Sequence, residues 1–108
     1  MWDERVVAAL VKIAKDDLQS QRWARDFSDK LRERNITAVM VQQVLEHPDI
    51  IVLYRHQGRT VFGFWSFRVK LVAVWTPSSP SRWVTVFWKA KGRRYLLSRE
   101  DAELIWTR

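Results

Sequence analysis

The sequence predicts an α+β fold in which N-terminal helices pack on one face of a four- to five-stranded antiparallel sheet, with a short C-terminal helix. Up to residue 47, apolar side chains recur at three- and four-residue spacings, whereas after Pro48 β-branched and aromatic residues dominate. The 108 residues are 47 % hydrophobic, which favours one globular domain over residues 1–108. Within it we expect a helical region over residues 1–47, a basic sheet region over residues 49–97 and a C-terminal helix over residues 98–107.

Three helices are predicted in the helical region. Residues 3–18 carry one apolar stripe, and the polar run that follows is either a break or an exposed face. Residues 21–34 form a second helix or continue the first, and Asn35 fits the left-handed position that ends a helix. Thr37 can cap the third helix, residues 38–46.

The sheet region predicts strands, because β-branched and aromatic residues are separated by turn residues. The expected strands are residues 50–56, 59–66, 68–76 and 82–89. Ser98 and Asp101 resemble the capping arrangement of a final helix. Alternation along the strands predicts that Val69, Leu71, Ala73, Val84 and Val86 face the helices.

Positive charge is concentrated in the second half of the chain. The net charge is +7, but residues 1–50 hold 8 Lys/Arg and 9 Asp/Glu, whereas residues 51–108 hold 11 and 3. Between Ile51 and Ser98 there are nine basic residues and no acidic one. Such a one-signed stretch is typical of a phosphate-binding surface, although a basic surface that serves solubility is the alternative.

We expect these basic groups, interleaved with aromatic rings, to lie on the open face of the sheet, where they could bind RNA or another single-stranded nucleic acid. The candidate binding residues are Arg55, Trp65, Arg68, Lys70, Arg82, Trp83, Thr85, Lys89, Lys91, Arg93 and Arg94. Trp65 and Trp83 are predicted to be the exposed stacking rings. The alternative for each of the seven tryptophans is a buried position in the core.

Several classes of function are excluded by composition. The chain has no Cys, which excludes disulfides, thiolate zinc sites and a Cys nucleophile. Two His are too few for a multi-histidine metal site, and three Gly form no phosphate-binding loop. No metal or cofactor is therefore expected. The N-terminus lacks the layout of a signal peptide and no apolar stretch could span a bilayer, so a cytoplasmic location without membrane contact is expected.

Two helical stretches resemble the signature of a family of small toxin-like domains. That signature is His-Ala-x-x-Arg-Met-x-x-Arg-Gly-Ile-(Ser/Thr), followed by x-x-Val-Leu-x-x-Pro. The matching segments are Asp26–Thr37, Val41–Pro48, the turn Gly58-Arg59 and the strand Val84–Phe87. The resemblance covers roughly residues 23–89 and is more specific in the helices than in the strands.

This resemblance implies the barnase–colicin–RelE-like ribonuclease fold, whose relatives include toxins that cleave RNA on an open sheet face. It implies a metal-independent endoribonuclease as the activity and an acidic antitoxin as a possible partner. The signature His falls on Asp26, its first Arg on Lys30, and its second Arg is kept as Arg34.

RNA cleavage by the 2′-hydroxyl needs a proton acceptor, a proton donor and positive charge near the phosphorus. His56 is the one histidine of the basic half, Arg59 and Arg34 could supply charge, and Tyr54 could donate a proton. The alternatives are a solvated hairpin residue for His56 and a helix-end cap for Arg34.

Three hypotheses therefore stay open. The chain is an RNA-cleaving toxin-like enzyme, a non-catalytic module that binds single-stranded nucleic acid, or a domain that docks an acidic protein partner.

Overall fold

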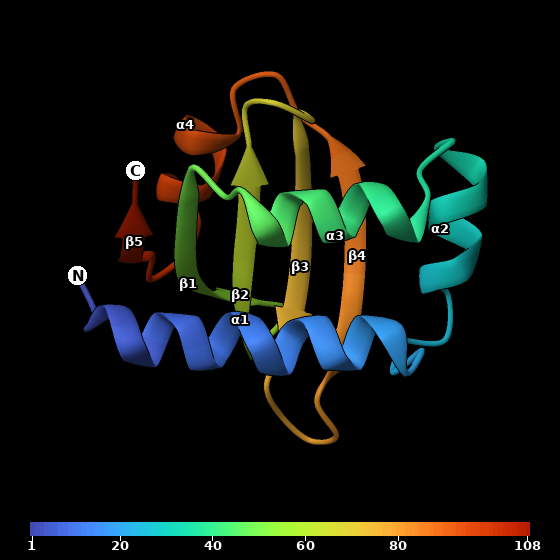
Figure 1. Ribbon diagram of the computed structural model, residues 1–108, viewed down its shortest axis with the longest axis horizontal. Coiled ribbons are helices and arrows are strands. Elements are labelled where there is room, and N and C mark those ends of the chain that lie inside the picture. The colour runs from blue at the N-terminus through green and yellow to red at the C-terminus, as the bar shows by residue number, and fades with distance from the viewer.

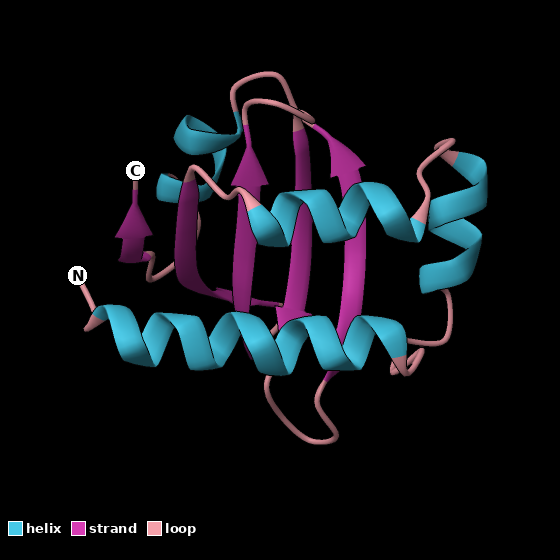
Figure 2. Cartoon of the chain, in the orientation of Figure 1, coloured by secondary structure: helices cyan, strands magenta, loops and turns pink.

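The computed structural model describes residues 1–108 and confirms the α+β class (Figures 1 and 2). The chain forms α1 (Glu4–Gln19), α2 (Phe27–Glu33), α3 (Ala38–Glu46), β1 (Ile50–His56), β2 (Arg59–Ser66), β3 (Leu71–Thr76), β4 (Arg82–Trp88), α4 (Gly92–Leu97) and β5 (Glu103–Thr107). The strands form one antiparallel sheet in the order β4-β3-β2-β1-β5.

Helices cover both faces of this sheet. Figure 1 shows α1 and α3 running across one face, with α2 beside the β4 edge. Between these helices and the sheet lies the larger core, which we call the first core; its largest side chains include Phe27, Phe64 and Trp83. On the other face Leu96 of α4 packs over Gly63 of β2 and belongs to a smaller cluster with Val52 and Val72, which we call the second core.

The strongly patterned elements lie where the sequence predicts them. Residues 38–46, 50–56 and 59–66 match α3, β1 and β2 residue for residue. Asn35 has the expected positive φ of 54°, and the Thr37 side chain accepts a hydrogen bond from the Met40 amide at 3.2 Å. The predictions that Asn35 ends a helix in the left-handed conformation and that Thr37 caps the next helix are therefore confirmed.

Two elements begin later than predicted, in both cases because backbone groups bond elsewhere. Residues 22–24 run beside β4 instead of forming helix: the Trp83 amide donates to the Arg22 carbonyl, and the Ala24 amide donates to the Trp83 carbonyl. The third strand starts at Leu71 rather than residue 68, since residues 67–70 form a turn in which Lys70 has a φ of 60°.

The short C-terminal helix exists, but its predicted position at 98–107 is wrong. It is α4, which ends before Ser98, and the Ser98 hydroxyl donates back to the Tyr95 carbonyl at 2.8 Å. The segment that follows turns at Asp101 and becomes β5, which pairs with β1. Ile105 is fully buried in the first core, so its burial in the sheet outweighs the capping pattern.

Sequence alternation fails in β4 because the strand has a bulge. The pairing with β3 shifts between Val74 and Trp75, so that Trp75 faces Trp83 while Val74 faces Thr85. The shift places Val84 against the second core and Trp83 in the first core, each opposite to the prediction. Trp83 is fully buried and is not a stacking ring.

Indole N–H groups link the sheet to the elements around it. Trp83 donates to the Ala14 carbonyl of α1 at 2.8 Å, and Trp75 donates to the buried carboxylate of Asp17 at 2.9 Å. At the β4 edge, Trp88 donates to the Arg34 carbonyl at 2.7 Å, and Arg34 in turn donates to the Val86 carbonyl at 2.6 Å. At the other edge the Trp2 indole donates to the Glu103 carboxylate at 3.0 Å, and the Trp2 backbone amide donates to the Ile105 carbonyl.

Replacing Trp83 by Phe should lower the free energy of unfolding in a urea titration by about 1–3 kcal/mol, with a further loss from the cavity that remains. The lost indole donor is buried against α1. Trp88→Phe is the matched control: it also loses one indole bond to a backbone carbonyl, but water can replace that bond because the side chain is 47 % exposed. An equal decrease in the free energy of unfolding in Trp83→Phe and Trp88→Phe would contradict the greater importance of the buried Trp83 hydrogen bond.

Candidate functional site

The nine basic residues between Ile51 and Ser98 gather at the two ends of the sheet instead of on its face. Antiparallel strands bring the β1–β2 turn and the β3–β4 loop to one end, and the β2–β3 turn and the start of α4 to the other (Figure 1). The first end holds Arg55, Arg59 and Arg82. The second holds Arg68, Lys70, Lys89, Lys91, Arg93 and Arg94.

The expected basic open face is therefore wrong. The second face of the sheet is lined by Val52, Val61 and Val74, and these side chains are buried together with Leu96 of α4. The central strands are apolar on both faces, which is typical of a sheet that is covered on both sides. Thr85 lies beside Val74 on this face and is half-buried.

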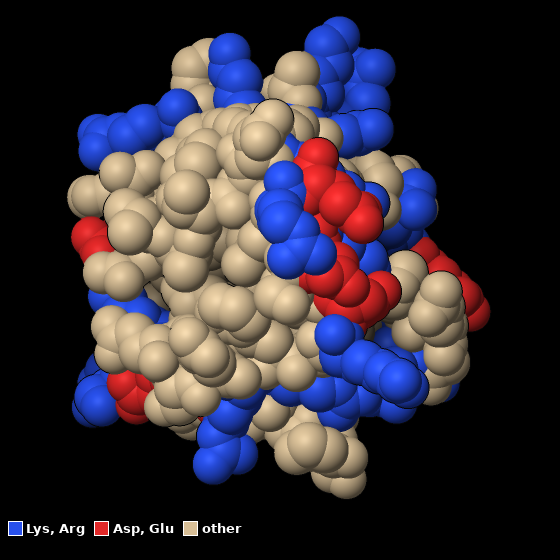
Figure 3. All heavy atoms as spheres, turned by 90° about the vertical axis from the view of Figure 1, so that its right-hand side faces the viewer, with Lys and Arg blue, Asp and Glu red and all other residues tan.

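Figure 3 views the side on which α2 lies and shows a run of acidic groups near its centre with Lys and Arg groups beside it, further groups of both signs around the margin, and a wide uncharged area. On α2 the charges are paired: Lys30 lies 3.4 Å from the carboxylate of Asp26, and Arg32 lies 2.7 Å from that of Asp29. This side of the molecule offers no continuous positive surface.

The basic end beside the β2–β3 turn carries an exposed aromatic ring that the sequence pattern does not single out. Phe67 is 62 % exposed, and the Lys70 ammonium lies 5.0 Å from its ring centroid. The Phe67 amide donates to the carboxylate of Asp49 at 2.7 Å, which fixes the turn. We call Phe67, Arg68, Lys70, Lys89, Lys91 and Arg94 the Phe67 cluster.

Trp65 lies under this cluster and contacts Phe67, Lys89 and Gly92. The prediction that its ring is exposed is wrong. It is only 5 % exposed, and its indole donates to the Lys89 carbonyl at 2.7 Å. Its ring lies against Gly92, where there is no room for a Cβ, and meets Phe67 edge-on at 6.2 Å between centroids. Trp65 therefore positions the basic segment that runs into α4.

The cationic groups of the Phe67 cluster have few partners within the protein. The side chains of Arg68, Lys91 and Arg94 make no hydrogen bond or ion pair, and all three are exposed. The neighbouring Arg93 differs, since its guanidinium donates to the Thr107 hydroxyl and the Asp49 carbonyl. Arg93 therefore fastens α4 to β5, and two of its five N–H donors are used within the protein.

A shallow pocket of about 480 Å³ opens within this end of the molecule. It is lined by Asp49, Trp65, Phe67, Ala90, Lys91, Arg93 and Arg94. Asp49 is its one carboxylate, and that group already binds the Phe67 amide and lies 3.9 Å from the Arg108 guanidinium. The pocket thus combines an aromatic wall with a surplus of positive charge.

The four residues predicted to be catalytic do not come together. His56 and Arg59 lie side by side as cross-strand partners in the β1–β2 hairpin. Arg34 lies at the β4 edge, where it binds the Val86 carbonyl. Tyr54 is 3 % exposed, and burial raises the pKa of its phenol well above the ordinary value for tyrosine, with a smaller contribution from Tyr95.

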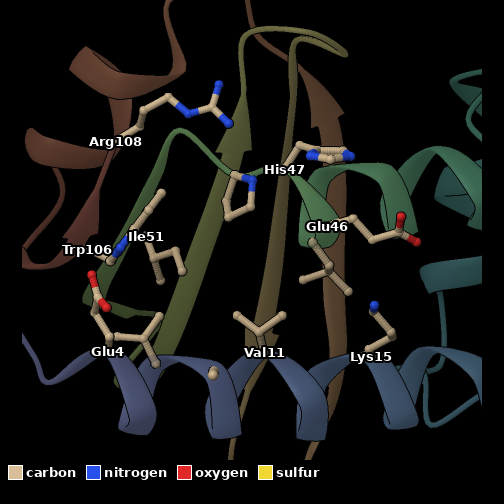
Figure 4. Close-up of a pocket in the computed structure, with 12 residues that line it drawn as sticks. Glu4, Val11, Lys15, Glu46, His47, Ile51, Trp106 and Arg108 are labelled. Carbon is tan, nitrogen blue, oxygen red and sulfur yellow. The ribbon is translucent and has the colours of Figure 1, made fainter.

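The largest hollow lies on the helical side, between α1 and α3 (Figure 4). It measures about 710 Å³, and Val11, Leu45 and Ile51 contribute to its apolar lining. Glu4, Lys15, Glu46 and Arg108 supply charges of both signs around it (Figure 4). This hollow therefore has no net preference for an anionic ligand.

The structure contains no group of three or more His, Cys, Asp or Glu side chains placed to hold a metal ion. None of its helices has the length and apolar character that a membrane span requires.

Comparison with protein-family models, with curated proteins and with solved structures finds no match to this chain. The resemblance to small toxin-like domains stays a prediction from the sequence.

Gly92→Ala should lower the free energy of unfolding by about 1–3 kcal/mol, because the new methyl group overlaps the buried Trp65 ring. Alanine is otherwise the better helix former, so a loss would be steric in origin. Urea titrations of Gly92→Ala, Trp65→Leu and the double variant give the coupling energy. We expect the double variant to be more stable than the two separate losses predict, and strictly additive losses would contradict the contact.

Proposed function

We propose that the protein binds single-stranded nucleic acid through the Phe67 cluster, with RNA as the first choice. The observation that carries this proposal is the exposed ring of Phe67 in one pocket with Lys91 and Arg94, whose side chains make no hydrogen bond or ion pair. Bases stack on exposed aromatic rings whatever their sequence, while Lys and Arg neutralise the phosphates on either side.

The local charge supports a phosphate ligand in particular. Arg68, Lys91 and Arg94 come from a turn and a helix start that lie next to each other, since the Lys89 amide donates to the Lys70 carbonyl. Lys91 and Arg94 line the same pocket, and like charges that share a pocket repel one another unless a counter-charge is present. A nucleic-acid strand supplies that counter-charge as a regular row of phosphates.

RNA is placed before DNA because residues 23–89 resemble toxin-like domains whose relatives act on RNA. Cleavage is left out of the proposal because Arg34 is held at another edge and Tyr54 is buried. An acidic protein would be attracted by the same charges, but it would not require the flat ring of Phe67 for stacking.

Phe67→Ala should weaken binding of a fluorescein-labelled oligouridine by about 1–3 kcal/mol, or roughly five- to a hundredfold in Kd, as measured by fluorescence anisotropy. Val39→Ala is the matched control, because Val39 is equally exposed at 65 % but lies on α3, away from the cluster. Unchanged affinity in Phe67→Ala, or tight binding of polyglutamate with none of oligouridine, would contradict the proposal.

Removing charge from the cluster should change the salt dependence of binding. For single strands the slope of log K against log salt is about −0.7 per neutralised phosphate. Lys91→Gln and Arg94→Gln should each make the slope shallower by up to about 0.7, whereas Lys12→Gln on α1 should leave it unchanged. Identical slopes in all four proteins, including the unaltered one, would show that these cations do not touch phosphate.

A further inference from the structure

We infer that His56, Arg59 and Arg82 form a separate site for a single phosphate group, either inorganic phosphate or a terminal phosphate monoester. This site lies at the end of the sheet opposite to the Phe67 cluster and does not depend on the nucleic-acid binding proposed above. We call it the His56 pocket.

The pocket is a defined cavity of about 210 Å³. His56 and Arg59 are directly opposed across β1 and β2, so their side chains leave the sheet on the same face. Arg82 begins β4, two strands away from β2. The remaining lining residues are Ala24, Gln57, Val61 and Val84.

Folding alone does not account for three basic side chains around one hollow. The side chains of His56 and Arg59 have no hydrogen-bond or ion-pair partner in the protein. The Arg82 guanidinium donates one hydrogen bond, to the Pro80 carbonyl at 2.8 Å. Basic groups that face each other across strands add no stability. No carboxylate lines the cavity, so the charge of Arg59 and Arg82 is left for an external anion.

The volume of the His56 pocket and its hydrogen-bond donors together indicate the class of ligand. A cavity of about 210 Å³ suits a compact anion with some water better than a run of nucleotides. Guanidinium groups match phosphate oxygens in paired hydrogen bonds. A phosphate monoester has three non-bridging oxygens and inorganic phosphate has four, which is enough for one to each of the three side chains, whereas an internal phosphodiester has only two.

The apolar wall strengthens this binding. Val61 belongs to the second core and Val84 packs against it, so one side of the pocket is closed to water. A lower local dielectric increases the attraction between the cations and the phosphate.

The test is a titration of the full chain with inorganic phosphate at constant ionic strength, followed by ¹H–¹⁵N NMR. We expect saturable shifts at His56, Gln57 and the side-chain Nε of Arg59 and Arg82. Arg59→Gln and Arg82→Gln should each raise Kd by about tenfold, because each removes a charge-assisted hydrogen bond. Arg55→Gln is the matched control, since Arg55 lies at the same end of the sheet and its guanidinium is bonded to the Gly58 carbonyl outside the pocket.

A second arm separates the sources of the phosphate. A 5′-phosphorylated dinucleotide that binds more tightly than inorganic phosphate would identify nucleic-acid ends as the ligand, and equal binding would identify free phosphate; both support the site. The proposed site would be overturned if inorganic phosphate caused no saturable shifts. It would also be overturned if the dinucleotide with a 5′-hydroxyl bound as tightly as the one with a 5′-phosphate. Phe67→Ala should leave this titration unchanged, so failure here is distinct from failure at the Phe67 cluster.

Discussion

The fold depends on tryptophan side chains that bury their rings and still use their N–H groups. Trp83 and Trp75 reach from the sheet to the backbone and to a carboxylate of α1, which fixes the helix across the strands. Trp65 does the same on the second face by binding the segment that leads into α4. A buried indole without an acceptor would cost free energy, so each ring specifies one position for the element that supplies the oxygen. Three of the seven tryptophans, Trp65, Trp75 and Trp83, are buried in this way.

The elements that follow from sequence alone are those whose local pattern and tertiary burial agree. The helix at 38–46 and the strands at 50–56 and 59–66 have such patterns, and their ends are marked by Thr37, Pro48 and the Gln57-Gly58 turn. The failures occur where a distant partner decides the outcome. Glu103–Thr107 joins β1 as a strand despite its capping pattern, and the bulge in β4 reverses the face of Trp83. No pattern within either segment reveals these pairings.

The candidate site shows the same division. The excess of positive charge in the second half is visible in the sequence, but its arrangement depends on how many faces of the sheet are covered. Because α4 covers the face that was expected to be open, basic side chains are confined to the strand ends. The exposure of Phe67 was not predicted, because Phe67 is the first residue after the end of β2 and lies outside the strand pattern. Its neighbours Arg68 and Lys70 are among the predicted binding residues. Its exposure arises from the turn at residues 67–70.

The contacts along β4 also restrict how the protein can meet other chains. The amide and carbonyl of Trp83 are already bonded to residues 22 and 24, and the Val86 carbonyl is bonded to Arg34. An extended peptide could not add to this edge by β-augmentation without first displacing the α1–α2 connection. The same shielding protects the β4 edge from edge-to-edge aggregation, which matters for a domain with so many apolar strands. At this edge, recognition of a partner is therefore directed to side chains and not to exposed backbone.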